Sequence, residues 1–274
     1  MSRAVEQKNS LDGFVKPGEL VEVRTGAKLS LHGRRVFNLL IENAWPEIEE
    51  NKTHRIPITK LRVPLHKGGE MVADSVLTLM TTVVEVPATL DGKPAIFATQ
   101  LLGPTTRTID EGSQSALLEY KFPDDLRRII KESHYWGRLK SHVMFAFSSK
   151  YALALYEAVC LRSNLRVNEQ AFSVDDFRAL LGIEPGKYDV FKNLKMRVLD
   201  PAVAEVNGLS DFTVELELLR EGGQLRGKLT GFRLWWEKKS PEEWQAVLDE
   251  LLRPKVGRKA RIRGRVETIQ LPGK

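Results

Sequence analysis

The predicted order of secondary-structure elements occurs twice in this chain, at an offset of about 115 to 120 residues. Each copy begins with a strand-like segment and a helix. It continues with a short helix, a longer helix and a β-hairpin, and ends with a closing helix. Short elements recur by chance in many mixed proteins, but a whole series in the same order favours duplication. The repeat therefore predicts two domains of one fold.

The first copy starts at residues 19–25, ELVEVRT, which alternate as a strand does. A helix opens at Ser30, where apolar residues begin to recur at helical spacing. The remaining elements are helices near residues 59–63 and 71–80, a hairpin over 82–102 turning at Asp91-Gly92, and a helix over 123–133.

The second copy gives the clearer pattern. Residues 138–147 are strand-like, and a helix follows from about Ser149. A short helix over 174–181, a long helix over 187–207, a hairpin over 212–236 and a closing helix from Ser240 complete the series. Ser173 with Asp176, and Ser240 with Glu243, have the spacing of helix caps. A hairpin directly after two such helices predicts a helix-turn-helix with a wing.

The predicted fold class is α+β, with two tandem winged-helix domains and a basic C-terminal tail. The chain has 274 residues, 42% hydrophobic and 28% charged, which fits two globular domains. We place the domains at residues 15–135 and 136–252, and a flexible tail at 253–274.

The basic excess is concentrated in that tail. The net charge is +6, but from Arg253 onward eight basic residues stand against one acidic residue. The tail therefore carries +7 and the rest of the chain −1. A basic tail favours a polyanionic partner. Recognition by the folded part must instead depend on where single charges are placed.

The long helix over 187–207 is predicted to read DNA. A helical wheel places Val190, Leu194 and Val198 on an apolar arc that faces the core. The second helix of a helix-turn-helix enters the major groove, where Arg or Lys donates to guanine and Asn pairs with adenine. Pro201 is unusual, because proline removes a helical hydrogen bond and usually kinks the helix. An ordinary solvated face is the alternative for any single helix.

The predicted DNA-binding residues combine this polar arc with cations that contact phosphate. They are Lys150, Lys187, Asp189, Lys192, Asn193, Lys195, Met196, Arg197, Arg226 and Lys228. Arg220 on the wing is a further candidate for phosphate contact, although any of the wing cations equally suits a solubilising surface.

Patterns typical of enzymes are missing from the sequence. GIEPGKY separates its glycines by three residues, whereas a phosphate loop needs four, and Tyr188 replaces the magnesium-binding Ser or Thr. The five histidines lack metal-site spacing, and Cys160 alone cannot form a disulfide or a cysteine-rich zinc site. Tyr188 also lacks the neighbouring histidines of a strand-nicking tyrosine. We expect no catalysis, metal or cofactor.

Three segments resemble the initiator replication proteins of iteron-containing plasmids. They are FSSKYALALYEAV, FSVDDFRALLGI and KYDVFKNLKMRVLDPAVAEVN, of which LDPAVAEVN is the most characteristic. KLSLHGRRVFNLLIENA and YKFPDDLRRII are similar to the first domain of that family. The resemblance covers residues 15–252 and leaves the tail outside it.

The resemblance implies a protein that binds repeated double-stranded DNA at an origin, assists duplex opening, and recruits the host helicase and host initiator. It also implies dimers formed through the first domain, in equilibrium with monomers, that repress their own promoter. Chemistry alone does not separate this function from that of a winged-helix repressor. Because the sequence has no apolar run long enough for a membrane span or a signal peptide, we expect a location in the bacterial cytoplasm.

Overall fold

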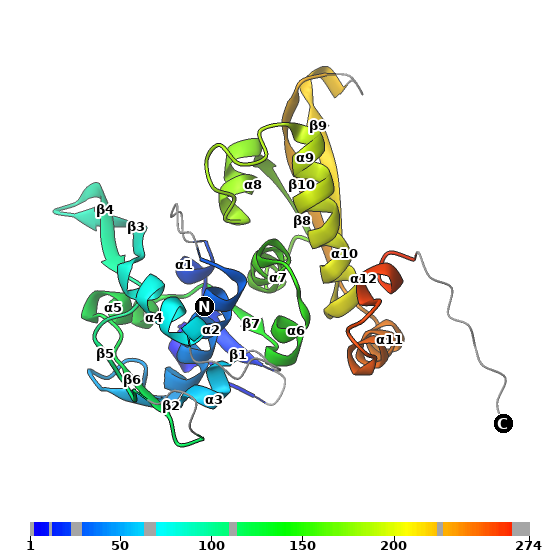
Figure 1. Ribbon diagram of the computed structural model, residues 1–274. Helices are drawn as coiled ribbons and strands as arrows, with labels where there is room; N and C mark the ends of the chain where they lie inside the picture. The colour runs from blue at the N-terminus through cyan, green and yellow to red at the C-terminus, as the bar shows by residue number, and fades with distance from the viewer. Residues whose placement is uncertain are drawn as a thin grey trace, which may run out of the picture.

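The computed structural model describes residues 3–10, 13–22, 29–62, 70–109, 114–223 and 227–264. At residues 70, 86–88 and 223 it describes the backbone only. Two lobes lie side by side, with the N-terminal half in one and the C-terminal half in the other (Figure 1). Each lobe has its own buried apolar cluster, and β7 and α7 lie between them.

The first domain is a winged helix. In chain order it contains η1 (Ala4–Glu6), β1 (Phe14–Pro17), α1 (Gly18–Val21), α2 (Leu31–Ala44), η2 (Trp45–Glu47), β2 (His54–Pro57), α3 (Ile58–Leu61), α4 (Glu70–Thr81), β3 (Val83–Leu90), β4 (Lys93–Gln100), β5 (Thr105–Arg107), β6 (Leu117–Tyr120) and α5 (Asp124–Glu132). Strands β2, β6 and β5 form one antiparallel sheet, and β3 pairs with β4 as the predicted wing. Asp91 and Gly92 have φ of 51° and 75°, as a tight hairpin turn requires.

The second domain repeats this order. It contains β7 (Trp136–Leu139), α6 (Ser141–Ala146), α7 (Lys150–Arg162), β8 (Glu169–Ser173), α8 (Val174–Leu180), α9 (Phe191–Leu194), η3 (Lys195–Leu199), α10 (Asp200–Leu209), β9 (Phe212–Arg220), η4 (Glu221–Gly223), β10 (Leu229–Lys238) and α11 (Pro241–Leu252). Strand β10 lies between β8 and β9, and β9 and β10 form the wing. The Ser240–Glu243 capping box opens α11 as predicted. The duplication of two winged helices is confirmed.

Two predicted strands are wrong. Within residues 19–25, α1 replaces the strand up to Val21, because adjacent Leu20 and Val21 are both buried in a helical turn; residues 23–25 lie outside the described part. Within residues 138–147, β7 ends at Leu139 and helix α6 follows. Adjacent Val143 and Met144 are both buried in α6, which a strand with one buried face would not allow.

The basic tail is folded over its first part, where the sequence predicted flexibility. Residues 253–264 include helix α12 (Arg258–Arg261), which lies beside the end of α10 in Figure 1. Arg258 is buried, because its guanidinium bonds to main-chain carbonyls at the end of α11. A count of charges in the sequence could not show that Arg258 is buried and bonded to the main chain. The predicted tail residues 265–274 lie outside the described residues.

The two domains share a strand pair and a buried ion cluster. Strand β1 pairs antiparallel with β7, so that Phe14 packs in the second core and Val15 in the first. Glu157 of α7 is fully buried and accepts from Lys16 at 3.1 Å, Arg34 at 3.3 Å and Asn38 at 2.7 Å. A charge of the second domain is therefore neutralised by residues of the first.

A lysine ties the end of the long helix to the start of the closing helix. Lys239 Nζ donates to the carbonyls of Asn207, Ser210 and Phe212 at 2.6, 2.8 and 2.8 Å. The last carbonyls of a helix have no partner within the helix, so an ammonium group is well placed there. This contact fixes the C-terminal end of α10.

We predict that Glu157→Ala lowers the free energy of unfolding by about 3 to 5 kcal/mol, because it leaves Lys16 buried without its counter-ion. Urea unfolding measures the loss. The double change Lys16→Met with Glu157→Leu should restore much of the stability, since an apolar pair of similar size needs no neutralisation. A loss below about 1 kcal/mol in Glu157→Ala would contradict the role of this cluster.

We predict that Lys239→Met destabilises the chain by about 1 to 3 kcal/mol, because the carbonyls at the end of α10 lose their donor. Lys238→Met is the matched control, since Lys238 is exposed and the change should stay within about 0.5 kcal/mol. Equal melting temperatures for the two variants would disprove the prediction.

Candidate nucleic-acid interface

The helix-turn-helix of the second domain begins at a side-chain cap. Ser173 Oγ accepts from the Asp176 N–H at 3.1 Å and donates to its carboxylate at 2.8 Å, which starts α8. The chain then turns through Gly186 and Tyr188, both with positive φ, of 76° and 57°. These left-handed residues prevent helix formation until Val190, the N-cap of α9.

The reading helix therefore differs from the predicted span of residues 187–207. It runs as α9, a π-helical turn η3 and α10, from Phe191 to Leu209. The π turn explains Pro201: the Asp200 N–H bonds to Lys195 O, five residues back, and this wider turn leaves room for the ring. The helix continues through the proline, where the sequence predicted a kink.

Packing selects which face of this helix meets solvent. Leu194, Val198, Ala202, Val206 and Leu209 are buried in the core that also contains α7. Val190 was predicted on that arc, but it is 62% exposed, because it lies at the N-cap, where the helical wheel does not yet apply.

Four predicted reading residues come together on the exposed face. Lys192, Asn193, Met196 and Arg197 are all exposed, and Met196 is 60% exposed. Within the described residues, the side chains of Lys192, Asn193 and Arg197 make no ion pair or hydrogen bond with the protein. The cationic groups of Lys192 and Arg197, the amide of Asn193 and the apolar side chain of Met196 are therefore accessible on one short stretch of helix. That is the chemistry that reads base edges in a major groove.

Other predicted residues already have ionic partners. Lys195 pairs with Asp200 at 2.6 Å, Asp189 with Arg178 at 3.5 Å, and both Lys187 and Lys150 with Glu184, at 2.8 and 3.4 Å. The hydrogen bond from Lys187 to Glu184 raises the pKa of that lysine, whereas burial lowers the pKa of Lys150. The ion pairs of Lys150, Lys187 and Asp189 lie at the turn before the reading helix, whereas the pair of Lys195 with Asp200 lies within the helix.

Arg178 is a positioning residue that the sequence analysis missed. Its guanidinium donates to the carbonyls of Lys187 and Tyr188 and pairs with Asp189, so it holds the turn that leads into α9. Because the main partners are backbone carbonyls, no spacing of side chains in the sequence indicates this role.

The wing lies beside the start of the reading helix. Arg220 lies over the Phe191 ring at 5.7 Å and donates to Gly227 O at 2.8 Å. Lys228 is exposed in the turn that joins β9 to β10, at the tip of the wing. Arg226 lies outside the described residues. Of the described wing cations, Arg220 is thus placed next to α9.

The corresponding helix of the first domain has different chemistry. Helix α4 buries Val72, Val76 and Leu79 and exposes Met71 and Leu77. Its sequence, EMVADSVLTLMT, contains no Lys or Arg. Cationic base reading is therefore favoured in the second domain.

Searches for other kinds of site were negative within the described residues. No group of three or more His, Cys, Asp or Glu side chains in that part of the chain has a metal-binding arrangement. Among the helices described, none combines the length and the apolar character needed to cross a membrane.

Comparison with known proteins identifies both halves. Residues 14–160 match the family described as initiator replication protein, WH1, and residues 173–234 match initiator Rep protein, WH2. A comparison with curated proteins gave no match.

Among solved structures, the chain is similar to the Pi initiator protein in complex with iteron DNA, with a TM-score of 0.60 and 18% identity over 85% of this chain and 100% of that chain. A structure of domains 2 and 3 of RctB matches more weakly, with a TM-score of 0.42 and 9% identity over 81% and 85% of the two chains. With both winged helices matched in order, this chain belongs to the family of initiator replication proteins.

Proposed function

We propose that this protein initiates plasmid replication by binding repeated double-stranded DNA at the origin. The observation that carries the proposal is that Lys192, Asn193 and Arg197, on the second helix of a helix-turn-helix, are exposed and have no side-chain partner among the described residues. The Pi initiator, which has the same fold, is known in complex with iteron DNA. Membership of the initiator family makes an origin the expected target.

The two domains would bind one face of the duplex together. Phosphate contacts from the wing, at Arg220, Arg226 and Lys228, orient the second domain while α9 reads bases. Lys150, Lys187, Asp189 and Lys195 complete the proposed contacts by exchanging their internal partners for DNA. Along the duplex, the same groove faces one side again about every 34 to 36 Å, which is one helical turn. A fixed distance between the two domains would therefore select the spacing of the sites within a repeat.

Origin activity further requires partners. We propose that monomers act at the repeats, assist duplex opening and recruit the host helicase and host initiator, and that dimers repress the protein's own promoter. The β3–β4 wing supports a dimer through the first domain, since Leu90 and Ile96 are 68% and 72% exposed on a two-stranded sheet. All these steps are binding events in the bacterial cytoplasm and need no catalysis or cofactor.

We predict that Asn193→Ala and Arg197→Ala each cost about 1 to 3 kcal/mol of binding to the repeat and relax sequence preference. Titration of labelled repeat and scrambled duplexes at one salt concentration gives the loss of affinity for the repeat and the ratio of the two affinities. Lys121→Ala, a change in the first domain far from α9, should leave the preference intact. If both reading-helix variants kept full discrimination, α9 would not be the reader.

Initiation is distinguished from simple repression by what binding does to the DNA. On a supercoiled plasmid carrying the repeats, we expect the protein to expose single-stranded bases beside them, measured by permanganate reactivity. The double variant Asn193→Ala with Arg197→Ala should fail to do so. Tight binding of the repeats without any opening, with host initiator present, would favour a repressor.

A further inference from the structure

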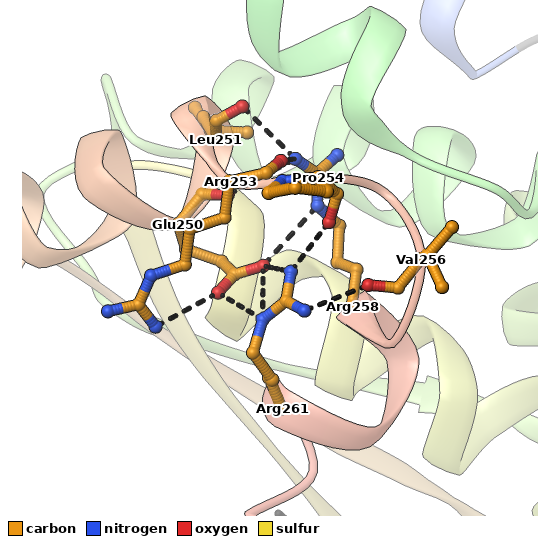
Figure 2. Close-up of polar contacts among 7 residues, drawn as sticks. All are labelled: Glu250, Leu251, Arg253, Pro254, Val256, Arg258 and Arg261. Carbon is orange, nitrogen blue, oxygen red and sulfur yellow. Dashed lines mark hydrogen bonds and ion pairs between the residues drawn. The ribbon is translucent and has the colours of Figure 1, made fainter. Parts of the chain in front are cut away.

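Residues 253–264 form a docked element built around one carboxylate. Figure 2 shows Glu250 of α11 receiving three guanidinium groups, from Arg253, Arg258 and Arg261. Arg261 makes the closest contacts, at 2.6 and 2.9 Å. Glu250 is only 9% exposed, and the hydrogen bonds from Arg261 hold the pKa of its carboxyl below the ordinary value.

The same arginines also fasten the main chain of this element. Arg258 is buried and donates to the carbonyls of Glu250, Leu251 and Arg253, each at 3.1 Å. Arg261 donates to the carbonyls of Val256 and Pro254 at 2.9 and 2.8 Å (Figure 2). Arg258 and Arg261 are therefore used to fold this element, and Arg253 adds an ion pair to Glu250 at 3.6 Å.

The element docks on the reading helix itself. Gly208 of α10 faces Ile262, and a Cβ atom at Gly208 would lie 2.7 Å from both Cβ and Cγ2 of Ile262. Glycine is what permits this approach. Gly208 follows Arg197 by eleven residues, about 16 Å along a helix axis. The tail thus lies against the far end of the helix whose beginning carries the reading residues.

Three further cations of this element are accessible to solvent. Lys255, Lys259 and Arg263 are exposed. Over the described residues, none of the three forms an ion pair with an acidic side chain. The docked element therefore presents uncompensated positive charge next to α10.

We propose that residues 253–264 bind the phosphate backbone of the duplex beside the groove that the reading helix enters. This inference rests on the proposed function, because it takes α9 to lie in a major groove. The helix from Phe191 to Leu209 is about 28 Å long, whereas the groove is about 12 Å wide, so its far end must pass beside a backbone. Lys255, Lys259 and Arg263 project from the element that covers that end.

The first test is the salt dependence of DNA binding by the full chain. Replacing Lys255, Lys259 and Arg263 together by alanine should reduce the slope of log affinity against log salt by about 2 to 3, since each phosphate contact contributes about 0.9. The ratio of repeat to scrambled affinity should not change. The matched control replaces Lys8, Arg166 and Lys238, three exposed cations outside this element, and should change the slope by less than half as much. Equal slopes for both triple variants would overturn the proposal.

The second test separates a docked element from a loose basic tail. Glu250→Gln removes a negative charge and releases the arginines, and Gly208→Ala leaves charge unchanged but pushes Ile262 away. We expect both to weaken DNA binding, whereas a loose tail predicts tighter binding for Glu250→Gln and no change for Gly208→Ala. Circular dichroism shows whether each variant is folded. If Glu250→Gln is unfolded, the DNA affinity of Gly208→Ala alone distinguishes a docked element from a loose tail.

Failure of the proposed function has a different signature. If the unaltered chain bound repeat and scrambled duplexes equally, sequence reading would be disproved. The effect of the triple variant on the salt slope would still report whether the tail contacts phosphate. If the unaltered chain preferred the repeat over the scrambled duplex, but the triple variant had the same salt slope as the unaltered chain, only the inference about the tail would be rejected.

Discussion

The arrangement of the two domains depends on the ion pairs and the hydrogen bond that the buried carboxylate of Glu157 accepts. It lies on α7, between the two lobes, and its partners Lys16, Arg34 and Asn38 all come from the N-terminal lobe. Burial lowers the pKa of Lys16, and the nearby Glu157 opposes that effect. Ion pairs of this kind add little net stability over an apolar pair, but they strongly disfavour arrangements that leave one charge alone. They therefore select one domain orientation.

That orientation matters because each domain alone offers few contacts for DNA. Helix α4 has no Lys or Arg, and among the described residues Lys192 and Arg197 are the only cations of the helix from Phe191 to Leu209 that form no ion pair. Under the proposed function, recognition would combine weak contacts from both domains, and combined binding is strong only when the geometry matches the spacing of the sites. A junction held by buried charges would set that geometry before the protein meets DNA, which would reduce the entropy lost on binding.

The sequence was sufficient for the order of elements, because that order follows from periodicity and caps such as Ser240 with Glu243. It was insufficient where backbone geometry or a backbone partner decided the outcome. The π turn before Pro201, the positive φ of Tyr188 and the bonds from Arg178 to backbone carbonyls leave no signature in the spacing of side chains. The exposure of Lys192, Asn193 and Arg197 was predictable, because solvent-facing positions need only the helical repeat.

The distribution of charge has a consequence for selectivity. Residues 1–252 carry a net charge of −1, so most of the protein surface has little attraction for DNA in general. General attraction grows with the number of phosphate contacts and falls steeply with salt, whereas base reading discriminates among sequences. The ion pairs to Glu250 fix most of the excess positive charge in an element beside α10. Under the proposed function, this charge would act only where the reading helix already lies, so that a docked tail would add affinity without adding equally to binding at wrong orientations.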